Sequence, residues 1–151
     1  MSESIRLCRS FQTAPSAVPR NDSTKYLDSV AHSDGLERPD WFCPDLEDSI
    51  NPELVETVRQ SIIDFATTAS SAGDLWPRIN WDAADDAADT RAVGRSDIDT
   101  LVREAGDSIT GFVVPNVGSS DSVERVIETV VDAESEYGFD SGTFEVCLII
   151  E

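Results

Sequence analysis

The sequence predicts an α/β protein in which parallel strands alternate with helices. Five short apolar runs with the composition of buried strands are separated by stretches that carry the apolar spacing of a helix. No turn motif typical of a β-hairpin joins two of these runs, so the connections are expected to be right-handed crossovers. Because ligands of such folds bind at the carboxyl ends of the strands, functional residues are expected directly after each strand.

The first strand and helix are expected between residues 5 and 31. A short run near residues 5–13 has the composition of a strand, and a loop bounded by Pro15 and Pro19 follows it. Beyond the loop, apolar residues recur at the spacing of one helical face: Leu27, Val30 and Ala31. This segment therefore has the order of one strand–helix unit.

The second strand is expected near residues 41–44, and a longer helix follows it. Asn51 precedes Pro52, and this pair favours a helix start because asparagine caps free N–H groups and proline fits the first helical position. The apolar face of this helix is expected to comprise Leu54, Val55, Val58, Ile62 and Phe65.

The third unit is expected to contain a brief strand and a long acidic loop. The run 75–79 is the candidate strand, and the acidic loop extends to about Gly94. Ser96 is expected to cap the next helix and Gly106 to end it. The apolar positions of that helix are Ile98, Leu101, Val102 and Ala105.

The last predicted helix lies between two strongly apolar strands. These strands are expected over residues 109–114 and 144–150. Asp121 is expected to start the helix, and Gly138 lies near its end. The residues expected to face inward are Val123, Val126, Ile127, Val130 and Val131.

This order of elements, βαβαβαβαβ, places residues 1–151 in a single α/β domain. A closed (β/α)₈ TIM barrel usually needs about 250 residues, and here no further helix follows the fifth strand. The sequence therefore predicts the amino-terminal five βα units of a TIM barrel with parallel strands, truncated after strand 5. The alternative is a complete, small, doubly wound domain that acts as a binding or regulatory module without catalysis.

The charge of the chain restricts its partners and its environment. Eleven Lys and Arg residues stand against thirty Asp and Glu residues, which gives a net charge of −19, and Lys25 is the only lysine. Such a surface repels nucleic acid and anionic membranes, and it stays hydrated in concentrated salt. No apolar run approaches the roughly 20 residues of a membrane helix, and residues 1–20 lack the apolar core of a signal peptide. We therefore expect a halophilic, cytoplasmic protein.

The cysteine and histidine residues exclude several kinds of site. Cys8, Cys43 and Cys147 are far apart and lie in strand-like runs, so they are expected to be buried thiols. Cys8 alone has an adjacent cation, Arg9, that could lower its pKa. The single histidine, His32, excludes a zinc site built from several histidines and disfavours a Ser-His-Asp triad.

Three acidic residues follow the second predicted strand. Asp45, Glu47 and Asp48 could bind a metal ion, orient a cation or position a proton of a substrate. In so acidic a chain they could equally form a solvated loop whose charge suits the start of the next helix. Both interpretations stay open on the sequence alone.

Arg78 and Glu151 are the other candidates at strand ends. Arg78 lies in an otherwise apolar run, and a guanidinium there needs anionic partners, either Glu47 or Asp48 or a substrate. Glu151 follows four apolar residues, so a barrel would place its carboxylate at the mouth, where it would suit a divalent cation. Alternatively, Glu151 is simply an exposed chain terminus.

Residues 85–89 match the DDxxD pattern by which helical prenyl-transferring enzymes bind magnesium diphosphate. That chemistry needs an all-helical fold and cations for the diphosphate, whereas this stretch is expected in an acidic loop of an α/β chain. The match is interpreted as accidental.

Together, these strand-end residues resemble the HpcH/HpaI aldolase and citrate lyase β-subunit family, which includes malyl-CoA lyases. The resemblance extends over essentially the whole chain but covers only the amino-terminal part of the family's domain. The similar motifs appear in the family's order: Arg9-Ser10, residues 45–50, Arg78-Ile79-Asn80, residues 111–115 and residues 148–151. The segments 10–15 and 111–118 are most similar to the haloarchaeal branch that contains a malate synthase.

The resemblance implies a TIM barrel, Mg²⁺ and small-molecule substrates, an acyl-CoA and a 2-oxo or 2-hydroxy acid, joined or cleaved by Claisen or retro-Claisen chemistry. Arg78, Glu47 and Asp48 would be the catalytic residues, with Arg78 binding the carboxylate or enolate oxygen of the substrate. Glu151 would be the first carboxylate ligand of Mg²⁺ and would contact substrate. Lys25 and Arg20 would bind the CoA phosphates, or would be ordinary surface cations.

The resemblance also implies what this chain lacks. The second Mg²⁺ ligand, an Asp after the sixth strand, and a lid lent by a neighbouring subunit would lie beyond Glu151. The 151-residue chain is therefore expected to be inactive alone, and the full-length protein is expected to be a homo-oligomer. Asn116 replaces the lysine that usually follows the fourth-strand proline, which weakens the case for CoA contacts.

Overall fold

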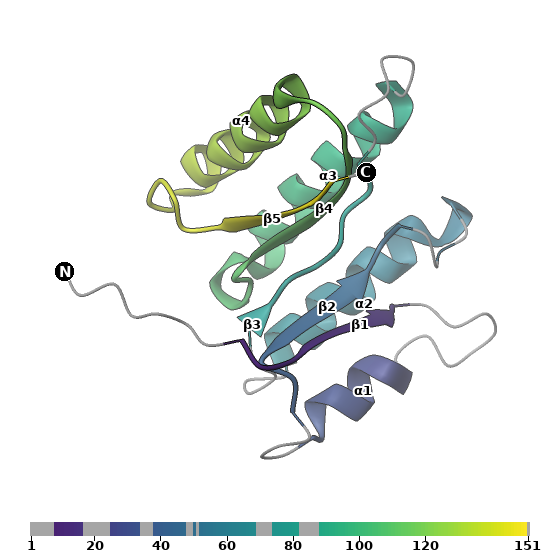
Figure 1. The fold of residues 1–151 in the computed structure, drawn as a ribbon. Helices are drawn as coiled ribbons and strands as arrows, with labels where there is room; N and C mark the ends of the chain where they lie inside the picture. Colours follow the sequence, from purple (N-terminus) through teal and green to yellow (C-terminus); the bar gives the residue numbers. More distant parts are fainter. Residues whose placement is uncertain are drawn as a thin grey trace.

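Helices and strands alternate along the described part of the chain. The computed structural model describes residues 8–16, 25–33, 38–47, 50, 52–68, 74–81 and 88–150. Figure 1 shows the strands as a twisted layer with helices packed beside it. The elements are β1 (Phe11–Pro15), α1 (Lys25–Ala31), β2 (Trp41–Asp45), the 3₁₀ turn η2 (Pro52–Leu54), α2 (Val55–Thr68), β3 (Asp74–Leu75), α3 (Ala88–Ala105), the 3₁₀ turn η3 (Gly106–Ser108), β4 (Gly111–Val117), α4 (Ser120–Tyr137) and β5 (Glu145–Ile150).

The strands are parallel and lie side by side in the order of the sequence. β1 pairs with β2, β2 with β3, and β4 with β5. Arg78, just beyond β3, joins the two groups because it bridges Asp45 on one side and Val113 on the other. The N–H of Val113 donates to the Pro77 carbonyl at 3.0 Å, and the N–H of Ile79 donates to Val113 at 3.1 Å. A doubly wound sheet reverses its strand order at a switch point, so the sequential order disagrees with that alternative.

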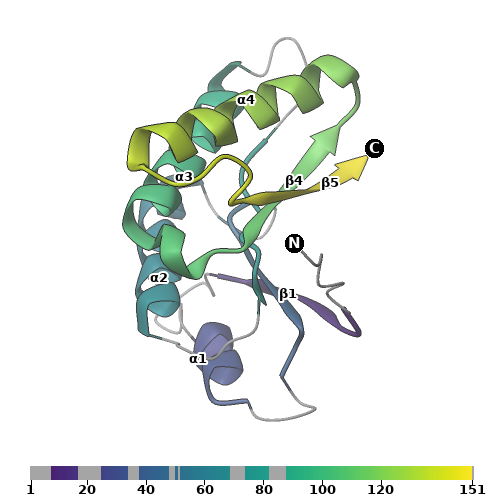
Figure 2. The ribbon, with the colours of Figure 1, turned by 90° about the vertical axis from the view of Figure 1, so that its left-hand side faces the viewer.

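The two faces of the sheet differ. Figure 2 shows α2, α3 and α4 together on one side of the strands. Strand residues that point to this side belong to the main core, among them Phe42, Phe112 and Val114. The intervening residues point to the opposite face, which we call the inner face, and form a smaller cluster there: Cys43, Trp76 and Val113. Alternation along each strand thus supplies two separate apolar surfaces.

Helix α3 begins at Ala88, so the predicted start at Ser96 is wrong. Ser96 is exposed and lies inside the helix. A Cβ atom on Gly94 would lie 1.9 Å from the carbonyl oxygen of Asn80, so a side chain there would push the helix away. Glycine is therefore present because α3 packs directly on this backbone, and it does not mark a loop. Asp89, the last acidic residue of the DDxxD match, also lies in α3.

Two helical segments bury narrower faces than the sequence predicts. On α4, Val126 and Val130 are buried, but Ile127 is 48% exposed and Val131 is 42% exposed. Leu54, at the end of η2, is also exposed. These side chains point away from the neighbouring helix and sheet, so the expectation that they face inward is wrong.

Strand limits and one cysteine also differ from expectation. Of the expected first strand, residues 5–7 lie outside the described residues, and β1 itself starts at Phe11. β3 is only Asp74–Leu75, although the N–H groups of Trp76 and Arg78 still donate to the carbonyls of Phe42 and Pro44 at 2.8 Å. Pro44 and Pro77 have no N–H to donate, which makes the pairing irregular here. Cys8 is exposed, contrary to expectation, while Cys43 is buried and Cys147 is partly buried.

Helix α4 has well-defined ends that set the position of β5. The Ser119 side chain accepts a hydrogen bond from the N–H of Ser122, and Gly138 ends the helix at a φ of 80°. Buried Glu134 then accepts hydrogen bonds from the N–H groups of Gly142 and Phe144, both at 2.9 Å. None of the helices in the described residues has the length and apolar character needed to cross a membrane.

Candidate active site

Arg78 lies between Asp45, the last residue of β2, and Val113 within β4, and its side chain forms a fork with Asp45. Its Nε donates to Asp45 Oδ1 at 2.7 Å, and its Nη2 donates to Oδ2 at 2.6 Å. The Arg78 side chain is 20% exposed and that of Asp45 is 6% exposed. Such a bidentate pair holds the guanidinium in a defined plane at the sheet edge.

Glu47 adds a second carboxylate to the same guanidinium. Its Oε2 lies 3.2 Å from Arg78 Nη1. The Glu47 backbone N–H donates to Asp45 Oδ1 at 2.9 Å, so Asp45 orients both the arginine and the turn that carries Glu47. The predicted ion pair of Arg78 with Glu47 is therefore present. That Asp45 is the main partner was not predicted from the sequence, although the parallel register places the end of β2 beside residue 78.

Asn116 brings β4 into this cluster. Its Nδ2 donates to Glu47 Oε1 at 3.0 Å and to the Trp81 carbonyl at 3.1 Å. Among the described non-glycine residues, Asn116 alone has a positive φ, 56°. From the sequence, Asn116 was interpreted only as the replacement of a lysine, although its place directly after a strand-end proline could have indicated a site residue.

A second network lies behind the cluster, between α2 and α3. Arg59 Nη2 donates to Asp97 Oδ1 at 2.6 Å, and both side chains are buried. Asn80 donates to Asp97 Oδ2 through its backbone N–H at 3.0 Å and through its side chain at 2.9 Å, and it also donates to the Leu46 carbonyl at 2.9 Å. Burial raises the pKa of the Asp97 carboxyl, and the hydrogen bonds from Asn80 and Arg59 oppose that change. This network was not predicted, because neither apolar spacing nor a motif in the sequence indicates it.

Two of the three thiols are poorly suited to nucleophilic chemistry. Burial, with a smaller contribution from the charge of Asp45, raises the pKa of the Cys43 thiol to about 12. Burial also raises the pKa of Cys147. A thiol with a raised pKa is largely protonated at neutral pH and reacts slowly.

The other predicted site residues are not gathered around Arg78 by any described contact. Asp48, Glu151 and Arg20 lie outside the described residues. Lys25 begins α1, is exposed, and has its Nζ 6.0 Å from the centroid of the Tyr26 ring. Among the residues that the structure describes, no group of three or more His, Cys, Asp or Glu side chains could hold a metal ion.

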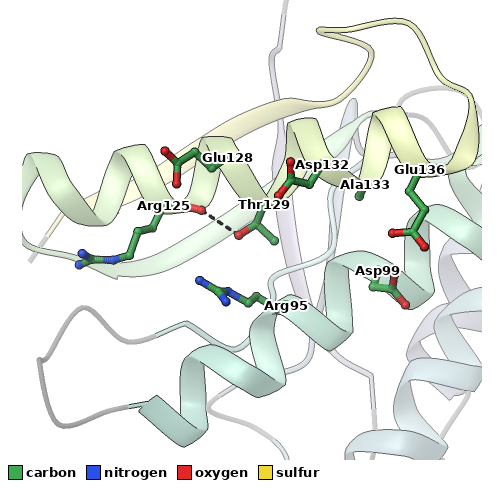
Figure 3. Close-up of a pocket in the computed structure, with 8 residues that line it drawn as sticks. All are labelled: Arg95, Asp99, Arg125, Glu128, Thr129, Asp132, Ala133 and Glu136. Carbon is green, nitrogen blue, oxygen red and sulfur yellow. Dashed lines mark hydrogen bonds between the residues drawn. The ribbon is translucent and has the colours of Figure 1, made fainter.

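A groove of about 240 Å³ lies away from the strand ends, between α3 and α4. Figure 3 shows Arg95 and Arg125 near one end of it, while Glu128 and Asp132 lie farther along α4. It is not at the carboxyl ends of the strands, where parallel α/β folds bind their ligands. The Arg78 cluster therefore remains the better candidate site.

Comparison with known proteins relates the chain to enzymes of haloarchaea. It is 38% identical over 148 residues to the L-malyl-CoA/beta-methylmalyl-CoA lyase of Haloarcula marismortui, and this match covers 97% of this chain and 42% of that protein. It is 34% identical over 149 residues to the malate synthase of Haloferax volcanii, and this match covers 95% of this chain and 34% of that protein. The chain thus spans less than half the length of the curated relatives it matches. No family model matches it.

Solved structures agree with this relationship. The Haloferax volcanii malate synthase in its magnesium/glyoxylate complex has a TM-score of 0.86 and 30% identity, over 93% of this chain and 42% of that one. The pyruvate/acetyl-CoA ternary complex has a TM-score of 0.88 and 28% identity, over 98% of this chain and 40% of that one. The chain therefore resembles part of a lyase and of malate synthases in both sequence and fold.

Proposed function

We propose that this chain is the amino-terminal part of a Mg²⁺-dependent lyase or synthase that breaks or makes a carbon–carbon bond between an acyl-CoA and a 2-oxo or 2-hydroxy acid. The observation that carries the proposal is the Arg78–Asp45–Glu47 cluster at adjacent strand ends. It occurs in a chain that is similar over 97% of its length to a malyl-CoA lyase. That similarity supports the reaction class, and the cluster contains the residues that would serve it.

The proposal includes the first five βα units of a TIM barrel as the framework of the site. Its support is the sequential strand order together with the position of the helices on one face (Figure 2). In a closed barrel, the inner face would be covered by the remaining strands. The carboxyl ends of β2, β3 and β4 would then form one sector of the mouth.

Arg78 would bind the carboxylate or enolate oxygen of the substrate. Asp45 orients the guanidinium through two hydrogen bonds. The Arg78 side chain is 20% exposed, so part of the side chain lies within reach of a ligand. A fixed guanidinium would stabilise the negative charge that develops on the substrate oxygen during Claisen or retro-Claisen chemistry. Glu47, and Asp48 by its proximity in the sequence, would help to orient Arg78.

The charge of the cluster fits a divalent cation. Counted over the described residues alone, one guanidinium against two carboxylates carries a net negative charge, which would repel an anionic acid unless further positive charge is present. Glu151, the predicted first ligand, would offer the hard carboxylate oxygen that Mg²⁺ prefers, while Glu47 would help to organise Arg78. Mg²⁺, when bound, would act as a Lewis acid that polarises the substrate carbonyl.

The remaining parts of the proposal concern the full-length protein. Lys25 and Arg20 would contact the CoA phosphates, as the family resemblance implies, and the exposed position of Lys25 at the start of α1 would allow this. The protein would work as a homo-oligomer in the salt-rich cytoplasm of a halophile, consistent with its net charge of −19.

The direct test is an assay of residues 1–151 joined to the corresponding remainder of the Haloarcula marismortui lyase. Cleavage of malyl-CoA or citryl-CoA, or condensation of acetyl-CoA with glyoxylate, would be followed with and without Mg²⁺. We expect Mg²⁺-dependent turnover by the chimera and none by the 151-residue chain. A folded chimera that turns over none of these substrates would overturn the proposal.

A further inference from the structure

Asn116 has an unusual backbone conformation at the end of β4. Its φ of 56° lies in the left-handed region, and the pairing of β4 with β5 shifts register between Val114 and Val117. Residues other than glycine rarely adopt this conformation, and asparagine tolerates it best. The backbone thus turns at Asn116 in a way that directs its side chain out of the regular strand pattern.

The side chain of Asn116 uses this turn to contact Glu47 from the side opposite Arg78. Asn116 Nδ2 donates to Glu47 Oε1 at 3.0 Å, while Arg78 Nη1 lies 3.2 Å from Glu47 Oε2. The second hydrogen bond of Nδ2, to the Trp81 carbonyl at 3.1 Å, anchors the amide to the backbone. Glu47 is therefore held between an anchored neutral donor and the guanidinium.

The neutrality of the amide has a consequence for charge. A cationic side chain at position 116 would compete with Arg78 for Glu47 and would partly neutralise the carboxylate. The amide orients Glu47 without adding charge to the cluster. Glu47 consequently remains on Nη1 and limits how freely another anion reaches that edge of the guanidinium.

We infer that Asn116 is a positioning residue that holds Glu47 against Arg78 and so controls access of an anionic acid to the guanidinium. The inference rests on the proposed function for its importance to catalysis, but the contact itself can be measured without catalysis. From the sequence alone, position 116 is notable only because asparagine replaces a lysine there, and the contact with Glu47 gives Asn116 a role of its own.

The experiment measures the reaction of Arg78 with phenylglyoxal, an arginine reagent, in the 151-residue chain. Modification of each arginine would be followed by peptide mass spectrometry. Asn116→Gly keeps the left-handed backbone accessible and removes only the amide, so it isolates the side chain. We expect the modification rate of Arg78 to rise about threefold to tenfold, because Glu47 loses a hydrogen bond made to its charged group. Asn116→Asp should raise the rate further, since it places a carboxylate against Glu47.

A double-mutant comparison shows whether Asn116 acts through Glu47. Glu47→Ala alone should raise the Arg78 rate, and adding Asn116→Gly to it should have no further effect. Exposed Arg103, on α3, is the internal control and should react equally in all variants. Buried Arg59 reports general opening of the fold.

Two outcomes would overturn the inference. One is an unchanged Arg78 rate in Asn116→Gly while Glu47→Ala raises it. The other is a parallel increase at Arg59 and Arg78, which would mean that the variant loosens the whole fold. Neither outcome depends on the lyase or synthase assay, so failure of the inference and failure of the proposed function can be told apart.

Discussion

Two arginine–aspartate pairs occupy different regions of this molecule and illustrate two uses of the same chemistry. Arg59 and Asp97 join α2 to α3, with side chains that are 3% and 0% exposed. Arg78 and Asp45 join neighbouring strands at the sheet edge, and Arg78 keeps 20% of its surface exposed. The main hydrogen bond of each pair is equally short, 2.6 Å. Exposure, not bond length, therefore distinguishes them.

The surroundings of the two aspartates explain this difference. Asp97 accepts hydrogen bonds from Arg59 and Asn80 on its two oxygens, so the closed network is internally satisfied. Asp45 and Glu47 hold Arg78 at the end of the strands, where a ligand can approach. The first pair serves the packing of helices, and the second is suited to recognition. Asn80 connects the two regions because it also donates to the Leu46 carbonyl, between Asp45 and Glu47.

The largest effect is expected from Arg59→Met. This change leaves the Asp97 carboxylate buried without its cation, which should lower the free energy of unfolding by about 3–5 kcal/mol. Urea unfolding in concentrated KCl would measure it. Arg103→Met, at an exposed position of α3, is the control and should change stability by less than about 0.5 kcal/mol. Equal losses in the two variants would remove the distinction between the closed network and an ordinary surface pair.

Arg78→Lys should affect activity more than folding. Lysine keeps the charge but cannot reproduce the fork to Asp45, so kcat/KM of the chimera should fall about 100-fold. Steady-state kinetics and unfolding would be measured on the same samples. If kcat/KM is unchanged, or falls only in proportion to lost folded protein, Arg78 belongs with Arg59 as a structural cation.

Gly94→Ala would disturb the connection between the two regions. Its Cβ would lie 1.9 Å from the Asn80 carbonyl oxygen, so α3 must shift, and stability should fall by about 1–3 kcal/mol. Thermal unfolding would show the loss. Ser96→Ala in the same helix is the matched control and should cost much less than the roughly 1 kcal/mol of a lost N-cap. A cost of that size in Ser96→Ala would restore the helix start expected from the sequence.

The smallest effect is expected from Asp40→Asn, which extends the comparison to a solvent-exposed pair. The side chain and backbone of Arg9 hold the pKa of the Asp40 carboxyl at about 2, below its ordinary value of 3.8. A carboxyl with a lowered pKa in the folded state stabilises the protein above pH 3.8, and this contribution is lost as the pH falls towards 2. The difference in unfolding free energy between wild type and Asp40→Asn should therefore shrink over that interval. A difference that does not vary with pH would contradict this.

Much of the architecture was predictable because it depends on local spacing. Residue patterns within a short stretch of sequence are enough to predict the alternation of strand and helix. They also predict the helix ends at Gly106 and near Gly138. An anionic partner for Arg78 near residues 47 and 48 was also predictable, since a guanidinium in an apolar run needs an anion, and Glu47 is one such partner. These features are determined by the sequence itself.

Other features depend on which distant segments meet. Asp45 is the main partner of Arg78 because of the parallel register, and Asp97 meets Arg59 because α2 packs on α3. Gly94 lies within a helix because α3 approaches the backbone of Asn80 too closely for any side chain. The short-range pattern contains no information on such approaches.

The sequence alone thus determined a parallel α/β chain with candidate groups at its strand ends. Only the tertiary structure decided which carboxylate orients the guanidinium, which arginine is closed off, and that Asn116 contacts Glu47. The physical reason is that apolar periodicity records which face of an element is buried, whereas polar pairing depends on distances of a few ångströms between elements far apart in the chain.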